Sequence, residues 1–104
     1  MGARIIVRNY TCAFGEIDII ALDRETLAFV EVRYRRKNRF GPAKESVTWA
    51  KQSRLIKAAS VFMATNASYC HRHCRFDIIG IDGCQQTVKA EWLKGAFHMT
   101  ETTS

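Results

Sequence analysis

GEIDII at residues 15–20 and FVEVR at residues 29–33 are the segments that decide the fold, because each places acids inside a run that otherwise has the composition of a buried strand. Asp and Glu are rarely buried unless they are paired or functional. Between the two segments, DRET at residues 23–26 is a polar interval that suits the loop of a β-hairpin. The pattern therefore predicts two antiparallel strands that carry a functional set of carboxylates.

The closure of this hairpin decides which side chains meet. If Leu22 lies opposite Leu27, then Asp18 lies opposite Glu31. Side chains alternate along each strand, so both acids then fall on one face of the sheet. Opposed side chains have Cβ atoms about 5 Å apart, which lets one divalent cation bridge two carboxylates. A slip of one residue would separate the acids onto opposite faces, so the register is itself a testable prediction.

Two further charged side chains fall on the same face in this register. Glu16 lies opposite Arg33, two residues along each strand from Asp18 and Glu31. Since Glu16 is on the same face as the two acids, it is a candidate for an additional metal ligand. Since opposite charges on facing strands attract, it is equally a candidate for the structural partner of Arg33.

The composition indicates one compact domain with a polyanionic partner. The chain has 104 residues, of which 47% are apolar and one is proline, so it is large enough for a single core and does not resemble a disordered chain. The net charge of +6 and the isoelectric point near 9.5 favour a nucleic-acid partner. The excess charge lies within residues 33–57, which hold one acid, Glu45, and the basic residues Arg33, Arg35, Arg36, Lys37, Arg39, Lys44, Lys51, Arg54 and Lys57.

The sequence carries no signal for export or for membrane insertion. The apolar run IIV at residues 5–7 is too short for a signal-peptide core, and no run approaches the roughly 20 residues that a membrane span needs. Four cysteines without a signal peptide indicate reduced thiols. A cytoplasmic protein without a membrane partner is therefore expected.

The order of the expected elements indicates an α/β fold. A helix is expected over residues 48–65, with Thr48 as its N-cap and an apolar stripe on one side. The order is βββαββ, which gives a mixed central sheet with a packed helix in a single domain over residues 1–104. The stripe consists of Leu55, Ile56, Ala59, Phe62 and Met63, and the strands are expected at residues 4–8, 16–22, 26–34, 76–81 and 87–92, with a basic loop at 35–44 and a flexible tail at 98–104.

Several motifs resemble one bacterial family. They are AFGEIDIIA at residues 13–21, FVEVRYR at 29–35, SVT at 46–48 with KQ at 51–52, and CRFDII at 74–79. In combination they resemble the YraN-type family of small bacterial proteins, over nearly the whole chain. That family is similar to archaeal Holliday-junction resolvases and to nucleases of the restriction-endonuclease-like fold. The resemblance implies this fold and a metal-dependent endonuclease that acts on structured or branched DNA.

The resemblance also implies a site, residue by residue. Asp18 and Glu31 would be the metal ligands, with the backbone carbonyl of Val32 beside them and Glu16 as a further candidate. Mg²⁺ or Mn²⁺ prefers such oxygen ligands and acidifies a bound water that attacks the phosphodiester. Gln52 matches the polar helix position that closes the site. The DNA phosphates would be held by Arg35, Arg36, Lys37, Arg39, Lys44, Lys51 and Arg54.

Two features depart from the family pattern. Arg33 stands where such nucleases have a lysine, and a guanidinium that stays protonated stabilises charge but does not act as a base. The family usually has a helix before its first strand, whereas this chain starts almost at that strand. Residues 1–3 are therefore expected to be a remnant or a shortened N-terminus, and reduced activity is one consequence.

Other chemically conspicuous residues have simpler interpretations. CHRHC at residues 70–74 crowds four potential zinc ligands together, but a second ligand pair at zinc-finger distance is missing. A polar turn is the preferred interpretation, and zinc is not expected. Cys12, next to apolar residues, is expected to be a small buried side chain. Asp77 is interpreted as an acid at a strand boundary and a minor candidate for the site.

Three functional hypotheses remain open. The first is the metal-dependent endonuclease, in which a two-fold dimer would suit paired cuts on a symmetric junction. The second is a nucleic-acid-binding module that keeps the fold without turnover, which Arg33 and the absent helix favour. The third is a structural or protein-interaction domain whose basic face is only solvated.

Overall fold

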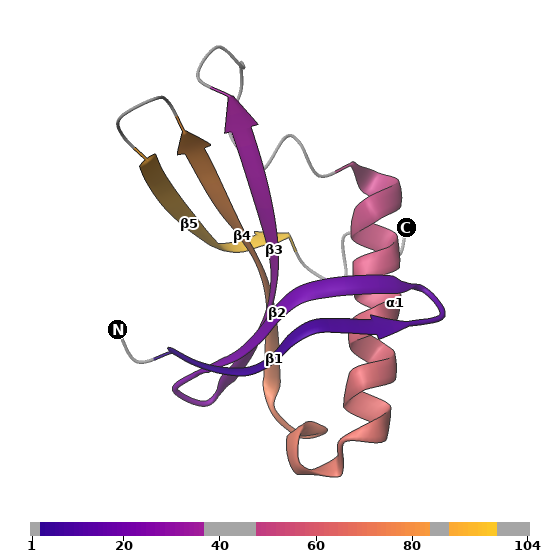
Figure 1. Ribbon diagram of the computed structural model, residues 1–104. Coiled ribbons are helices and arrows are strands. Elements are labelled where there is room, and N and C mark those ends of the chain that lie inside the picture. The colour runs from indigo at the N-terminus through magenta and orange to yellow at the C-terminus, as the bar shows by residue number, and fades with distance from the viewer. Residues whose placement is uncertain (1–2, 37–47, 84–87, 98–104) are drawn as a thin grey trace.

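The computed structural model describes residues 3–36, 48–83 and 88–97, which form an α/β fold with a five-stranded mixed sheet (Figure 1). The strands lie in the order β1-β2-β3-β4-β5, with β3 and β4 parallel and the other neighbours antiparallel. This confirms the predicted order βββαββ and the mixed sheet. The elements are β1 (Ala3–Cys12), β2 (Gly15–Asp23), β3 (Thr26–Arg36), α1 (Trp49–Thr65), the short 3₁₀ helix η2 (Ala67–Tyr69), β4 (His73–Gly83) and β5 (Val88–Phe97).

The hairpin of β2 and β3 has the predicted register. Leu22 pairs with Leu27, and the ladder continues outward to a pair between Asp23 and Thr26. The turn is therefore the two residues 24–25 rather than the predicted four, and Arg24 adopts a positive φ of 59° to close it. Two-residue hairpin turns need such left-handed conformations because their twist then matches that of the strands.

All the strands are longer than the sequence predicts. β1 extends to Cys12, β4 starts at His73 and β5 extends to Phe97. The added residues are largely polar, and their backbone groups find partners on neighbouring strands, so pairing rather than apolar composition sets the strand ends. The expected tail at 98–104 and residues 1–2 lie outside the described residues.

Helix α1 begins where the sequence predicts and covers one face of the sheet (Figure 1). The side chain of Thr48 accepts a hydrogen bond from the backbone N–H of Lys51 at 3.2 Å, as an N-cap does. The buried side of the helix differs slightly from the predicted stripe. Ala58 is buried in addition, whereas Ile56 and Met63 are only partly buried against the core, and the fully buried helix residues are Leu55, Ala58, Ala59 and Phe62.

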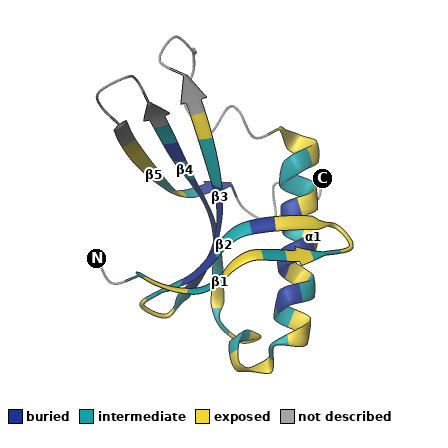
Figure 2. Cartoon of the chain, in the orientation of Figure 1, coloured by how far each residue is buried: buried dark blue, intermediate teal, exposed yellow. Residues whose placement is uncertain are grey.

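Aromatic rings connect the helix to the sheet. The ring of Phe62 on α1 meets Tyr10 edge-on at 5.3 Å and Phe29 at 6.1 Å. Phe29 stacks on Phe76 at 5.5 Å, which in turn stacks on Phe97 at 5.0 Å. Figure 2 shows buried residues along one side of α1 and in the middle of the sheet, on β2, β3 and β4. This continuous core fixes the position of α1 relative to β2 and β3, which carry the candidate site. Within the described residues, no helix is long and apolar enough to cross a membrane.

The sheet face opposite α1 carries a buried polar network centred on Asp77. Its carboxylate is fully buried and accepts hydrogen bonds from the guanidinium of Arg75 at 2.8 and 3.0 Å. The indole N–H of Trp92 and the backbone N–H of Gly95 also donate to it, each at 2.9 Å. The interpretation of Asp77 as a boundary acid or a site candidate is therefore wrong, because the residue lies mid-strand, on the face away from the predicted site, with its acceptors engaged.

The same network predicts an acid-sensitive contribution to stability. The carboxylate of Asp23 accepts hydrogen bonds from Arg75 at 2.9 Å and from Lys94 at 3.2 Å, and these partners, Arg75 foremost, lower the pKa of Asp23 below its usual 3.8. A lowered pKa in the folded state stabilises the fold above pH 3.8, and this contribution is lost as the pH falls through the folded-state value. Chemical unfolding of wild type and Asp23→Asn between pH 2 and pH 7, about the range over which carboxylates titrate, should show a constant stability difference at higher pH that shrinks in acid. A difference that does not change with pH would contradict this role.

Candidate functional site

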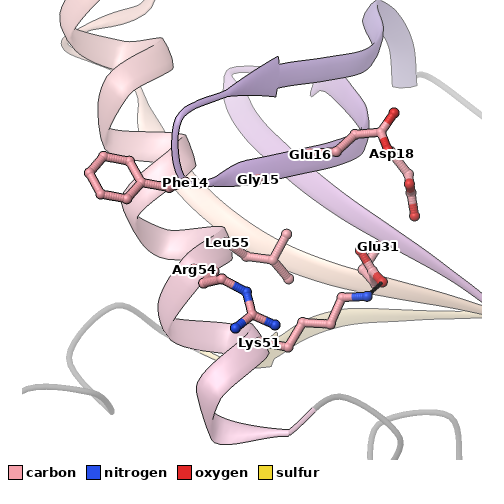
Figure 3. Close-up of a pocket in the computed structure, with 8 residues that line it drawn as sticks. All are labelled: Phe14, Gly15, Glu16, Asp18, Glu31, Lys51, Arg54 and Leu55. Carbon is pink, nitrogen blue, oxygen red and sulfur yellow. Dashed lines mark ion pairs between the residues drawn. The ribbon is translucent and has the colours of Figure 1, made fainter.

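A cavity of about 220 Å³ lies between β2 and the first half of α1, at the place where the predicted site residues gather (Figure 3). Acidic side chains enter it from the strands and basic side chains from the helix. This separation of charge by element brings both signs to one cavity. The lining residues are Phe14, Gly15, Glu16, Asp18, Glu31, Lys51, Arg54 and Leu55.

Glu31 is the most deeply placed acid of this cavity. Only 4% of the residue is exposed, and its side chain projects from β3 toward α1. One oxygen, Oε2, contacts the ammonium Nζ of Lys51 at 2.8 Å and the guanidinium Nη1 of Arg33 at 3.3 Å. A buried carboxylate without a partner would be strongly destabilising, and these two cations are the partners of Glu31.

Asp18 is held beside Glu31 by the backbone of β3. Its Oδ2 accepts a hydrogen bond from the N–H of Val32 at 2.8 Å. The ladder between β2 and β3 has the predicted register, but its last pair is Ile19 with Val30, one residue short of the predicted pair of Asp18 and Glu31. At that point the carboxylate of Asp18 accepts from a β3 amide. The two acids nevertheless line the same cavity, as the predicted face requires.

Asp18 also borders a second hollow. A cavity of about 400 Å³ is lined by Ile5, Arg8, Asn9, Asp18, Ile19, Val32 and Tyr34. Arg8 is exposed, and 78% of the surface of Tyr34 is accessible. Asp18 therefore lines both cavities.

The other predicted site residues are placed less centrally. Glu16 is exposed and lines the cavity, whereas Arg33 and Gln52 are not among the lining residues. Arg33 reaches the site through Glu31, two residues before it on the same strand. Gln52 belongs to the first turn of α1, where its N–H donates to the carbonyl of Thr48 at 2.8 Å.

The predicted phosphate-binding residues divide into two groups. Lys51 and Arg54 line the cavity from α1. The backbone of residues 35 and 36 belongs to β3, but the side chains of Arg35 and Arg36 lie outside the described part of the structure. The remaining predicted residues, Lys37, Arg39 and Lys44, also lie outside it.

Sequence reasoning missed Phe14 as a lining residue. In the tight turn between β1 and β2, Cys12 pairs with Gly15. Gly15 has a φ of 136°, a backbone conformation that glycine adopts readily and other residues rarely adopt. This turn carries Phe14, which is 43% exposed and lies 5.8 Å from the ammonium of Lys57. The signal was the glycine after AF, which marks a turn once β1 is recognised as extending to Cys12.

The metal-ligating side chains of the described residues form no cluster that would hold an ion by itself. Across residues 3–36, 48–83 and 88–97, no group of three or more His, Cys, Asp or Glu side chains is placed to hold an ion. In the segment at 70–74, Cys70 is exposed, and the thiol of Cys74 lies 3.8 Å from the sulfur of Met63. Burial raises the pKa of Cys74, which keeps it protonated. Cys12 is partly buried against the core, as expected.

Comparisons with known proteins cover the strands and the helix that form the cavity. A sequence profile of the family described as "Uncharacterised protein family UPF0102" matches residues 1–81. A UPF0102 protein of Nitrosococcus oceani is 48% identical over 98 residues, which cover 94% of this chain and 79% of that protein. A UPF0102 protein of Alcanivorax borkumensis is 47% identical, with 93% and 78% covered. The chain therefore belongs to the UPF0102 family, which is the YraN-type family that its motifs resemble.

Proposed function

We propose that this protein is a metal-dependent endonuclease for structured or branched DNA, with its centre in the cavity that Asp18 and Glu31 share. The observation that carries the proposal is the convergence of two carboxylates from adjacent strands with Lys51 and Arg54 from the helix. A single structural ion pair would need one acid and one cation, whereas this cavity is lined by more than one side chain of each charge. The mixed sheet with a helix after its third strand also fits the proposed restriction-endonuclease-like fold, a support by analogy.

The acids of the cavity fit a magnesium or manganese ion. Mg²⁺ is usually bound by one or two carboxylates together with waters and substrate phosphates rather than by a full protein cage. Asp18 and Glu31 supply two carboxylates. Val32, whose carbonyl would be the third ligand, follows Glu31 in sequence and donates its N–H to Asp18. When bound, such an ion acidifies a water and neutralises charge on the phosphoryl group.

The residues of the chain supply binding and orientation. Val32 holds Asp18 through its N–H, and Lys51 and Arg33 hold the Glu31 carboxylate. Arg54, exposed on α1 at the cavity, brings a fixed positive charge to a DNA phosphate. Because the sequence contains no evident base-reading motif, recognition would rest on phosphates and DNA shape. Two copies related by a two-fold axis would present two such cavities to a symmetric junction.

Cleavage of a synthetic four-way DNA junction tests the proposal. The purified protein should cut the junction with Mg²⁺ or Mn²⁺ and remain inactive when the metal is chelated. Junction binding without cleavage under any of these metals would instead favour the non-catalytic binding module, which the arginine at position 33 supports. Absence of both binding and cleavage would leave the interaction-domain hypothesis.

Salt dependence provides a prediction for the binding step. If roughly five to eight phosphates are neutralised, the logarithm of DNA affinity should fall against the logarithm of salt concentration with a slope of about −4 to −7. Arg54→Met should weaken all DNA sequences alike and reduce the slope by about one, because one phosphate contact is lost. Charge removal at Arg35, Arg36 and Lys37 should act in the same way.

A matched variant separates contact from net charge. Arg4 is exposed at the start of β1 and does not line the cavity, so Arg4→Met removes the same charge elsewhere. It should leave the slope unchanged. A DNA affinity that does not vary between low and moderate salt would contradict DNA binding at the cavity. Equal slopes for Arg54→Met and Arg4→Met would contradict it as well.

A further inference from the structure

We propose that Lys51 on α1 is the catalytic cation of this site and takes the place of the strand lysine that Arg33 replaces. The inference rests on the proposed function. Its role would be to contact the attacking water or the phosphoryl oxygen next to Glu31, rather than to hold DNA as one cation among several.

The contacts of Glu31 favour Lys51 over Arg33. Both cations meet the same oxygen, Oε2, but Lys51 lies at 2.8 Å and Arg33 at 3.3 Å. Lys51 also lines the cavity together with Asp18, whereas Arg33 does not. Figure 3 shows the ammonium of Lys51 reaching from the helix to Glu31. The cation that lies closest to Glu31 and lines the cavity therefore comes from the helix.

The position of Lys51 within α1 is not explained by helix stability. Lys51 is the third residue of the helix, and the first turn contains no acid. A cation in the first turn is disfavoured because the helix dipole makes this end positive. The backbone N–H of Lys51 is nevertheless fixed by the cap of Thr48, and its side chain is directed to Glu31. A side chain that is held in a locally unfavourable position by a contact inside a cavity is typical of functional sites.

The chemistry of an ammonium suits this role better than that of a guanidinium. An ammonium has three donors on a compact group, so the contact with Glu31 leaves donors for a water and for a phosphoryl oxygen. The planar guanidinium has a fixed fork that suits bidentate binding of a single anion. A donor aimed at developing negative charge in an enclosed site accelerates hydrolysis without tightening substrate binding.

The test compares Lys51→Met and Lys51→Arg with Arg4→Met, which removes the same charge outside the cavity. Junction cleavage is measured under single-turnover conditions with saturating DNA, and junction affinity is measured separately. Lys51→Met should slow cleavage about 100-fold or more, with a dissociation constant within about threefold of that of Arg4→Met. Lys51→Arg, which keeps the charge and supports the fold, should still cleave at least about tenfold slower than wild type.

A second measurement does not depend on cleavage. Removing a cation beside Glu31 removes repulsion for a divalent ion, so Mn²⁺ should bind Lys51→Met about tenfold more tightly than it binds Arg4→Met. If wild type cleaves and both Lys51 variants cleave at the wild-type rate, the assignment of Lys51 is overturned while the nuclease proposal stays intact. The same holds if Lys51→Met binds Mn²⁺ no more tightly than Arg4→Met does. A wild type that never cleaves would overturn the proposed function itself, and this inference with it.

Discussion

Asp18→Asn and Glu31→Gln are each expected to abolish metal-dependent cleavage while leaving DNA binding at least as tight as in wild type. Both acids line the cavity, so loss of either removes one of the two carboxylates available to the ion. The cleavage rate should fall by at least about 10²–10³, as it does when an electrostatic contact to a transition state is removed. Binding should not weaken, because the variants remove negative charge near the DNA phosphates. Single-turnover cleavage and filter binding measure the two effects separately.

The same variants should lose the thermal response to metal. An ion that binds only the folded state stabilises it by about 2.7 kcal/mol at 100 times its dissociation constant, which for a chain of this size raises Tm by about 10 °C or more. Wild type should show this rise with Mn²⁺, and Asp18→Asn and Glu31→Gln should not. Glu91→Gln, which removes an exposed acid on β5, is the matched control and should respond like wild type. If Mn²⁺ still raises the Tm of the variant that carries both Asp18→Asn and Glu31→Gln, the ion binds elsewhere.

Asp77→Ala is expected to cause the largest loss of stability. The substitution leaves the guanidinium of Arg75, the indole N–H of Trp92 and the N–H of Gly95 without their shared acceptor in a buried position. Breaking a buried ion pair by removing one partner costs about 3–5 kcal/mol of unfolding free energy. For a domain of this size the loss corresponds to a Tm lower by about 12 °C or more. Thermal and urea unfolding would measure it.

Asp77→Asn separates the charge from the hydrogen bonds. The amide keeps one oxygen acceptor in nearly the same volume, so the loss should be smaller than in Asp77→Ala. If both variants unfold within about 0.5 kcal/mol of wild type, which is the range of ordinary surface substitutions, the network centred on Asp77 does not stabilise the sheet.

The hairpin register and the helix start could be predicted because local rules determine them. Leu22 opposite Leu27 follows from the apolar pattern around a polar turn, and Thr48 is a residue type that caps helices. The end of the ladder could not be predicted in the same way. The carboxylate of Asp18 accepts a hydrogen bond from the amide of Val32. The spacing of apolar residues does not reveal that a side chain competes with backbone carbonyls for an amide.

Long-range partners account for the other differences. The sequence places Lys51 in a run of basic residues, and charge alone does not show that its partner is Glu31, because that contact depends on how α1 packs against the sheet. Asp77 reads as a boundary acid for a related reason. Its neighbour Arg75 lies two positions away in the sequence, but Trp92 and Gly95 come from β5, which extends beyond the predicted end at residue 92.

The position of a bound ion tests the central claim most directly. A crystal of the protein soaked with Mn²⁺ should show an anomalous-scattering peak coordinated by carboxylate oxygens of both Asp18 and Glu31, inside the cavity that α1 closes. A well-ordered cavity without a peak at saturating Mn²⁺, or a peak only at other residues, would contradict the assignment of these two acids as the metal centre.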